Sequence, residues 1–189
     1  IGAYNDFWMD RGTNTDETRR TSLILDPPNG RLPDMTDAGQ ARRSSAPSSF
    51  TDKIYDSYTD LSNFDRCIMG FNAGPPMTPG AYNNNMQLFQ TPDYVAIVTE
   101  MVHTTRIIPL GDAAGSNDAI RQWSGNSHAH WDGDTLVVET ENFNDHDVYA
   151  NWRSSSKNMK VVERFTRIDD ATLSYEFTVN DSDTWTSPW

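Results

Sequence analysis

The sequence lacks the features of a membrane protein and of a disulfide-stapled domain. No unbroken apolar stretch approaches the roughly 20 residues that a membrane helix requires. The chain has a single cysteine, Cys67, which cannot form a disulfide within the chain. A buried, reduced thiol is the favoured interpretation because free cysteines are among the most buried residues, and a bridge to a partner outside the chain is the alternative. We therefore expect a soluble protein with no membrane span.

Positive charge is also scarce. Lys and Arg together number 15 against 27 Asp and Glu, which gives a formal net charge of −12. The acidic residues are spread along the chain rather than gathered in a tail, so most of the surface would repel nucleic acid or an anionic membrane. The composition therefore predicts that nucleic acid is not a partner.

Common catalytic motifs are missing as well. Serines are numerous, yet none stands in a Gly-x-Ser-x-Gly elbow between a strand and a helix. There is no glycine-rich loop of the kind that holds phosphates. The sequence thus disfavours a serine hydrolase and a nucleotide-dependent enzyme, and we predict no cofactor.

Residues 1–80 are predicted to form a long irregular arm. Asn, Asp, Pro, Gly and Ser recur every few positions, and only residues 22–25 are typical of a strand. A short helix is expected from Thr36 to Arg43 after a Thr cap, and one helical turn from Phe64 to Met69. The arm has too many aromatic rings for a disordered tail, so we expect it to pack on its own sheet or on a neighbour. These rings are Tyr4, Phe7, Trp8, Phe50, Tyr55 and Tyr58.

Residues 81–189 are predicted to form one antiparallel β domain. In the last strand Leu173, Tyr175, Phe177 and Val179 alternate with polar residues, as in a strand with one buried face. Turns are expected at 132–134 and 169–170, where Asp and Gly tolerate positive φ. The fold class is therefore all-β, an antiparallel sandwich or partial barrel with short helices. The expected strands are 86–90, 94–102, 104–109, 128–132, 135–141, 158–167 and 172–179.

Several motifs resemble an uncharacterised family of secreted bacterial proteins. The most specific are WDGDTLVVET at 131–140 and ERFTR at 163–167. Further matching stretches are 7–12, 25–31, 81–85, 120–123 and 184–186, so the resemblance covers nearly the whole chain. It implies that a signal peptide and a further segment precede the equivalent of Ile1 and that the family continues past the equivalent of Trp189. This chain would then be a middle portion, its location periplasmic or extracellular, and Cys67 could pair with a cysteine in the tail.

The strongest chemical candidates lie around one core strand. Glu100 is expected to be a buried acid on or just after this strand, with His103 and Arg106 close behind it. Together they could place an acid, a base and an anion-binding group at one rim. The favoured alternative is a structural ion pair, because buried polar clusters are more often structural and no nucleophile accompanies them.

Two weaker candidates concern a metal and a sugar. His128 and His130 are alternate residues on a strand and therefore point to the same side, but two ligands do not make a metal site, and no third ligand is placed beside them. The resemblance leads us to expect basic or glycine residues at these two positions. Asn180 begins the only N-glycosylation pattern. We predict no metal and treat this glycosylation site as weak.

The sequence favours a noncatalytic extracellular protein that assembles with copies of itself, with the protomer of a helical filament as one form of this hypothesis. The ring-bearing arm and the absence of a complete catalytic set support this hypothesis. An extended segment that adds to a strand edge is a general route to such assembly. The alternative is a small-molecule-binding or enzymatic domain with a polar pocket around Glu100, His103 and Arg106. Glycans are a possible further partner through exposed Trp rings.

Overall fold

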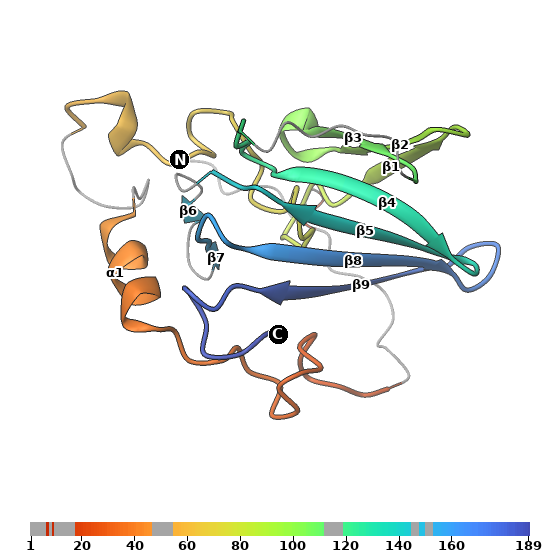
Figure 1. Cartoon of the computed structure of the whole chain (residues 1–189), viewed down its shortest axis with the longest axis horizontal. Coiled ribbons are helices and arrows are strands. Elements are labelled where there is room, and N and C mark those ends of the chain that lie inside the picture. The colour runs from red at the N-terminus through yellow and green to blue at the C-terminus, as the bar shows by residue number, and fades with distance from the viewer. Residues whose placement is uncertain are drawn as a thin grey trace.

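The computed structural model describes residues 7, 9, 18–46, 55–111, 119–144, 148–149 and 153–189. Most of the strands belong to two antiparallel sheets (Figure 1), which confirms the all-β prediction. The first sheet has the order β1-β2-β3 and the second the order β4-β5-β8-β9, while β6 and β7 form a separate short pair. The strands are β1 (Met86–Gln90), β2 (Tyr94–Thr99), β3 (Thr105–Pro109), β4 (Asn126–Asp132), β5 (Thr135–Glu141), β6 (Val148–Tyr149), β7 (Arg153–Ser154), β8 (Lys160–Arg167) and β9 (Leu173–Asn180).

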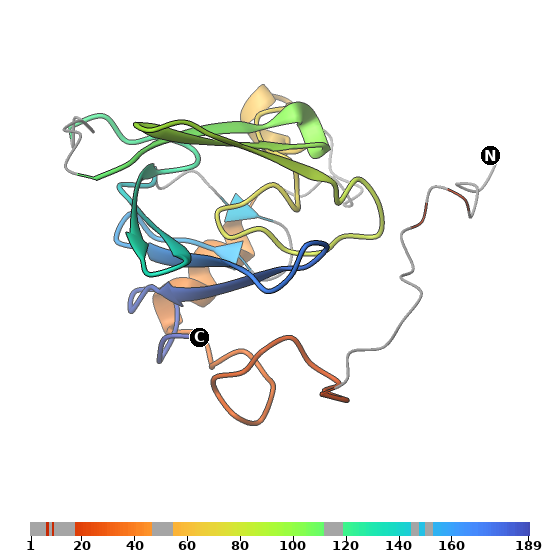
Figure 2. The ribbon, with the colours of Figure 1, turned by 90° about the vertical axis from the view of Figure 1, so that its right-hand side faces the viewer.

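The two larger sheets lie over one another as two layers (Figure 2). Val95, Ile97 and Ile108 of the three-stranded sheet belong to one buried cluster with Ala129, Leu136, Val138 and Phe165 of the four-stranded sheet. A bridge between Leu110 and Ala129 links the end of β3 to β4, so the sheets meet along one side. The result is a sandwich open elsewhere, and no closed barrel forms among the described residues.

The predicted hairpins are present in the four-stranded sheet. β4 turns into β5 through Gly133 and Asp134, with Gly133 at a φ of +61°. This left-handed conformation suits glycine, which has no Cβ to clash. Between β8 and β9, the side chain of Asp169 accepts a hydrogen bond from the Ala171 backbone N–H. Both connections confirm that Asp and Gly mark the turns of this sheet.

Residues 61–85 have little regular structure, yet much of this segment is buried. Met69 and Ala73 are core residues, and the rings of Phe64, Phe71 and Tyr82 contact one another in sequence. The Met77 backbone N–H donates a hydrogen bond of 2.8 Å to the Tyr175 hydroxyl on β9. The segment runs between the levels of the two sheets (Figure 2), and this bond ties it to the four-stranded sheet.

Helix α1 (Asp37–Ser45) begins at the predicted Thr36 cap and docks on the end of the chain. The Thr36 hydroxyl accepts a hydrogen bond from the Gly39 N–H and donates one to the Asp183 carbonyl. Arg42 donates to the same carbonyl and to the Thr184 hydroxyl. The buried Asp181 carboxylate accepts hydrogen bonds from Ser156 and Thr184, so this turn is fixed from both sides.

Several local predictions were wrong. Residues 22–25 form no strand and Phe64–Met69 forms turns rather than a helix. Strand β2 ends at Thr99 because Val102 and His103 adopt positive φ within a short 3₁₀ helix, η3 (Met101–His103). Cys67 is exposed in a turn rather than buried. A second 3₁₀ helix, η2 (Tyr58–Asp60), precedes the buried segment.

Replacing Gly39 by Ala should loosen α1 from the C-terminal turn. A Cβ at this position would lie 2.6 Å from the Thr184 carbonyl oxygen, next to the Asp183 carbonyl that Thr36 and Arg42 bind. We expect a loss of about 1–3 kcal/mol in the free energy of unfolding, typical of overpacking, measured by urea unfolding. Ala41→Gln, at an exposed position of the same helix, is the control, and equal stability of the two variants would contradict this docking.

Candidate functional site

An ion pair lies buried between the two sheets. Arg106 on β3 donates from Nη1 to Glu163 Oε2 at 2.6 Å and from Nη2 to Glu163 Oε1 at 2.9 Å. The Glu163 side chain is fully buried and that of Arg106 nearly so. The Tyr175 hydroxyl donates to Glu163 Oε1 at 2.7 Å and accepts from the Met77 N–H. One carboxylate thus joins the three-stranded sheet, the four-stranded sheet and the buried segment.

The charges of this network are fixed by their mutual contact. Burial by itself would lower the pKa of Arg106, but the charge of Glu163 and its hydrogen bonds outweigh this effect, so the pKa is raised. Burial raises the pKa of Tyr175 well above its usual value, and the adjacent Glu163 carboxylate adds to the shift. Arg106 therefore remains charged and Tyr175 protonated, as expected of a structural network rather than of a group that exchanges protons near neutral pH.

The predicted trio of Glu100, His103 and Arg106 is not brought together as one rim. Glu100 is exposed, contrary to its expected burial, and accepts hydrogen bonds from the backbone N–H and side-chain amide of Asn85. His103 is exposed in η3. Arg106 faces the interior, where its partner is Glu163. The structural ion pair that we favoured exists for Arg106, but with a different acid.

Glu163 was missed from the sequence although a signal was available. It lies between Val161 and Phe165 in the two-residue period of β8, and all three are buried. A charged residue at an inward position of a strand requires a partner of opposite charge. The period indicates that such a partner exists but does not identify Arg106.

A cavity of about 270 Å³ lies beside Tyr175. Its lining contains asparagines, methionines and threonines but no carboxylate, imidazole, Lys or Arg among the described residues. The Tyr175 hydroxyl is already engaged on both sides. The lining therefore supplies no acid and base pair for catalysis. The lining residues are Asn72, Met77, Thr78, Pro79, Asn83, Asn84, Asn85, Met86, Thr99 and Tyr175.

His128 and His130 lie on the exposed face of β4. His128 Nε2 lies 3.0 Å from Glu139 Oε2 on the neighbouring strand. In the described part of the chain, no three His, Cys, Asp or Glu side chains are grouped to hold a metal ion. His146, which could supply a further imidazole, lies outside the described residues. The pair therefore takes part in the polar surface of the four-stranded sheet.

Asn180 is exposed at the end of β9, beside the buried Asp181. Its glycosylation stays a prediction. Of the aromatic rings considered for glycan contact, Trp185 is buried while Trp131 is exposed. Trp152 lies outside the described residues.

The outer face of the three-stranded sheet is largely apolar although it is turned away from the core, with Gln87 and Thr105 beside Val98 as its polar residues. Phe89, Ala96 and Ile107 form a row across the three strands, and Tyr94 pairs with Pro109 beside it. Phe89, Tyr94 and Ile107 are exposed, Ile107 to 70 %. We call this surface the apolar sheet face and define it by Phe89, Tyr94, Ala96, Val98, Ile107 and Pro109. It has no charged member, and large exposed apolar patches mark interaction sites.

No known protein family, curated protein or solved structure matches the chain. The resemblance to secreted bacterial proteins therefore stays a prediction. Within the described residues, no helix has the length and apolar character needed to cross a bilayer. The fold and its surfaces thus define the class: a two-layer antiparallel β protein with an apolar outer face on its smaller sheet.

Glu163→Gln should destabilise the protein by about 3–5 kcal/mol, because it leaves the Arg106 charge buried without a counter-charge. The measurement is urea unfolding followed by tryptophan fluorescence. Glu139→Gln on the exposed face is the control. The double variant Arg106→Leu/Glu163→Leu should be more stable than Glu163→Gln, because it removes both buried charges. A Glu163→Gln variant as stable as the control would contradict the role of this pair.

Tyr175→Phe should cost about 1–3 kcal/mol at neutral pH, since it leaves buried polar partners unsatisfied. The pKa of Tyr175 is raised in the folded chain, while an unfolded tyrosine titrates near pH 10. Above that pH the unfolded chain releases a proton that the folded chain retains, so the Tyr175 contribution to stability falls as pH rises.

The difference in unfolding free energy between the parent protein and Tyr175→Phe should therefore shrink above pH 10. Urea unfolding at a series of pH values measures it. Tyr58→Phe, at an exposed ring, is the matched control and should show no such change. A constant difference across the series would contradict the buried, protonated state of Tyr175.

Proposed function

We propose that the protein is a noncatalytic extracellular structural protein that self-assembles through the apolar sheet face. The observation that carries this proposal is the exposed row of Phe89, Ala96 and Ile107. Burying one large apolar side chain contributes about 1.5–3 kcal/mol. A partner that covers this row gains that contribution from several side chains at once.

Charge makes the apolar sheet face the favoured place for copies to meet. Two molecules of net charge −12 repel one another over most of their surface. The apolar sheet face has no charged member, whereas the outer face of the four-stranded sheet carries ion pairs such as Lys160–Glu141 and Arg164–Asp132. Contact through the apolar sheet face therefore avoids both charge repulsion and the desolvation of ion pairs.

The chemistry of the interior also supports a structural role. The buried acid Glu163 and base Arg106 neutralise one another, and Glu100 is bound by Asn85. An extracellular location follows from the resemblance to secreted proteins and belongs to the proposal. Detection of the protein in the culture medium of its natural source, against a cytoplasmic marker, tests this location.

Ile107→Glu should convert the assembled protein to a monomer. The side chain is 70 % exposed, so the fold tolerates the change, but a carboxylate in the contact would have to be desolvated without a partner. Sedimentation velocity over a range of protein concentrations measures the effect. Ile168→Glu, at an isoleucine 63 % exposed in the β8–β9 hairpin, is the matched control. A parent protein that stays monomeric throughout the range would overturn the proposal.

A further inference from the structure

A second exposed apolar segment lies in the arm. We call residues 18–25 the donor segment. Leu23 is 81 % and Leu25 53 % exposed, and the two alternate with the less exposed Ile24. The Ser22 hydroxyl donates to the Gly30 carbonyl and accepts from the Ile24 N–H, which holds this part of the segment in place. Within the described residues, the backbone groups of Leu23 and Leu25 form no hydrogen bond.

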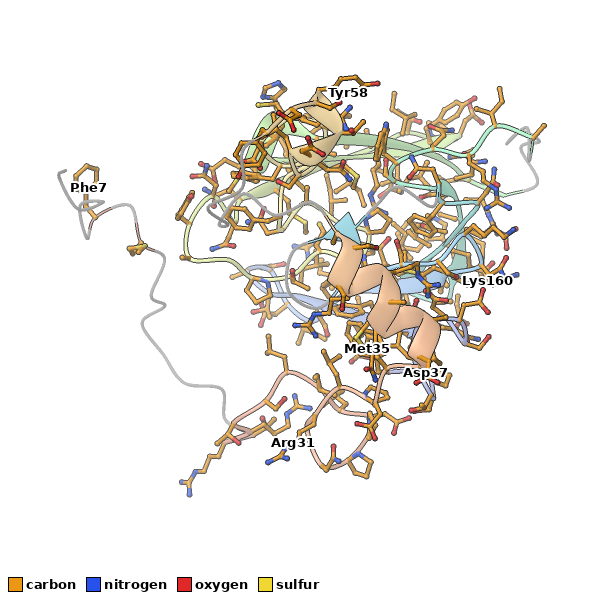
Figure 3. All side chains as sticks on the ribbon, turned by 90° about the vertical axis from the view of Figure 1, so that its left-hand side faces the viewer. Phe7, Arg31, Met35, Asp37, Tyr58 and Lys160 are labelled. Carbon is orange, nitrogen blue, oxygen red and sulfur yellow. The ribbon has the colours of Figure 1, made fainter. Side chains whose placement is uncertain are left out.

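The donor segment and the apolar sheet face lie at opposite ends of the molecule. Strands β1, β2 and β3 lie at the top of Figures 1 and 2, whereas the chain that leads from the donor segment toward α1 lies at the bottom of both. Figure 3 places Arg31, a few residues beyond the donor segment, at the same lower end. The two surfaces therefore cannot cover one another within one molecule, but they can meet between two copies.

Charge matches these two surfaces. The donor segment carries Arg19 and Arg20 and no acid in a chain of net charge −12, although Asp16 and Glu17 precede it and Asp26 follows it. Arg19 and Arg20 of the donor segment are exposed. The apolar sheet face is flanked by the acids Asp93 and Glu100, which stand at the two ends of β2 and are exposed. The Arg19–Arg20 pair is thus complementary in charge to the acids beside the apolar sheet face.

We infer that the donor segment of one copy binds along β2 on the apolar sheet face of the next, with Leu23 packed on the row of Phe89, Ala96 and Ile107 and Leu25 over Val98. The lengths agree. With about 3.3 Å per extended residue, Leu23 over Ala96 places Arg20 about 10 Å away, which is also the separation of Asp93 from Ala96. The short side chain of Ala96, between two large ones, leaves room for a leucine.

This contact is heterologous, because two different surfaces of the protein meet. Each contact uses one donor segment and one apolar sheet face, so the assembly keeps a free donor segment at one end and a free apolar sheet face at the other. Further copies bind these surfaces, and the assembly grows as an open chain unless the rotation between copies closes a ring. With the surfaces at opposite ends of the molecule, the product is an open filament. Two apolar sheet faces that met each other would instead give a closed dimer.

The inference rests on the proposed function, and complementation between two variants tests it separately. The acceptor-defective variant is Ile107→Glu, and the donor-defective variant is Leu23→Glu/Leu25→Glu. Each retains the surface that the other has lost. We expect each alone to be monomeric and an equimolar mixture to form a one-to-one dimer that grows no further. Sedimentation velocity measures the species, with Ile168→Glu and the exposed Leu173→Glu as controls that should assemble like the parent.

The other outcomes separate the inference from the proposed function. A donor-defective variant that assembles as well as the parent shows that faces pair with one another, which overturns the inference and leaves self-assembly intact. Two monomeric variants whose mixture is also monomeric overturn it as well. A monomeric parent protein overturns both the inference and the proposed function.

Discussion

The carboxylate of Glu163 is the constraint on which the arrangement of the molecule depends. It receives Arg106 from one sheet and Tyr175 from its own sheet, and Tyr175 in turn receives the Met77 N–H of the buried segment. The buried carboxylate requires Arg106 and Tyr175 as donors, because an uncompensated carboxylate inside a protein is costly, and the Met77 N–H in turn fixes the Tyr175 hydroxyl. The spacing of the two sheets and the position of residues 61–85 are therefore set together rather than independently.

The polar and apolar residues of the three-stranded sheet are distributed in an unusual way. Its inner face supplies Arg106 to the ion pair, while its outer face presents Phe89, Tyr94 and Ile107 to the surroundings. The four-stranded sheet has the ordinary distribution, with Leu136 and Val138 inside and His128 and Glu139 outside. The difference is local to the outer face of the smaller sheet, which is the surface through which we propose that copies meet.

The regular parts of the fold could be predicted because they depend on local chemistry. The alternation of Tyr175, Phe177 and Val179, the turn at Gly133 and the cap at Thr36 are each contained in a few consecutive residues, and all three occur as expected. The β-type residues 22–25 form no strand, since a strand requires a neighbour and none pairs with them in the described structure.

The candidate site could not be predicted, because its members are far apart in the sequence. Arg106 and Glu163 lie on different sheets, and only the packing of those sheets brings them together. Glu100 was expected to be buried on or just after the core strand. The left-handed backbone at Val102 and His103 ends that strand early and leaves the acid exposed to solvent. Cys67 was expected in the core because free cysteines are often buried, but the turn in which it lies leaves it exposed.

Two exposed features of the fold are related, and this relation bears on the assembly that we propose. The donor segment has strand-forming residues without a strand partner, and the apolar sheet face has core-forming residues without a covering layer. Each of these two surfaces supplies one side of a contact that β proteins ordinarily form, namely strand pairing or the packing of a layer on a sheet. In the assembly that we propose, a second copy supplies the missing half of each contact.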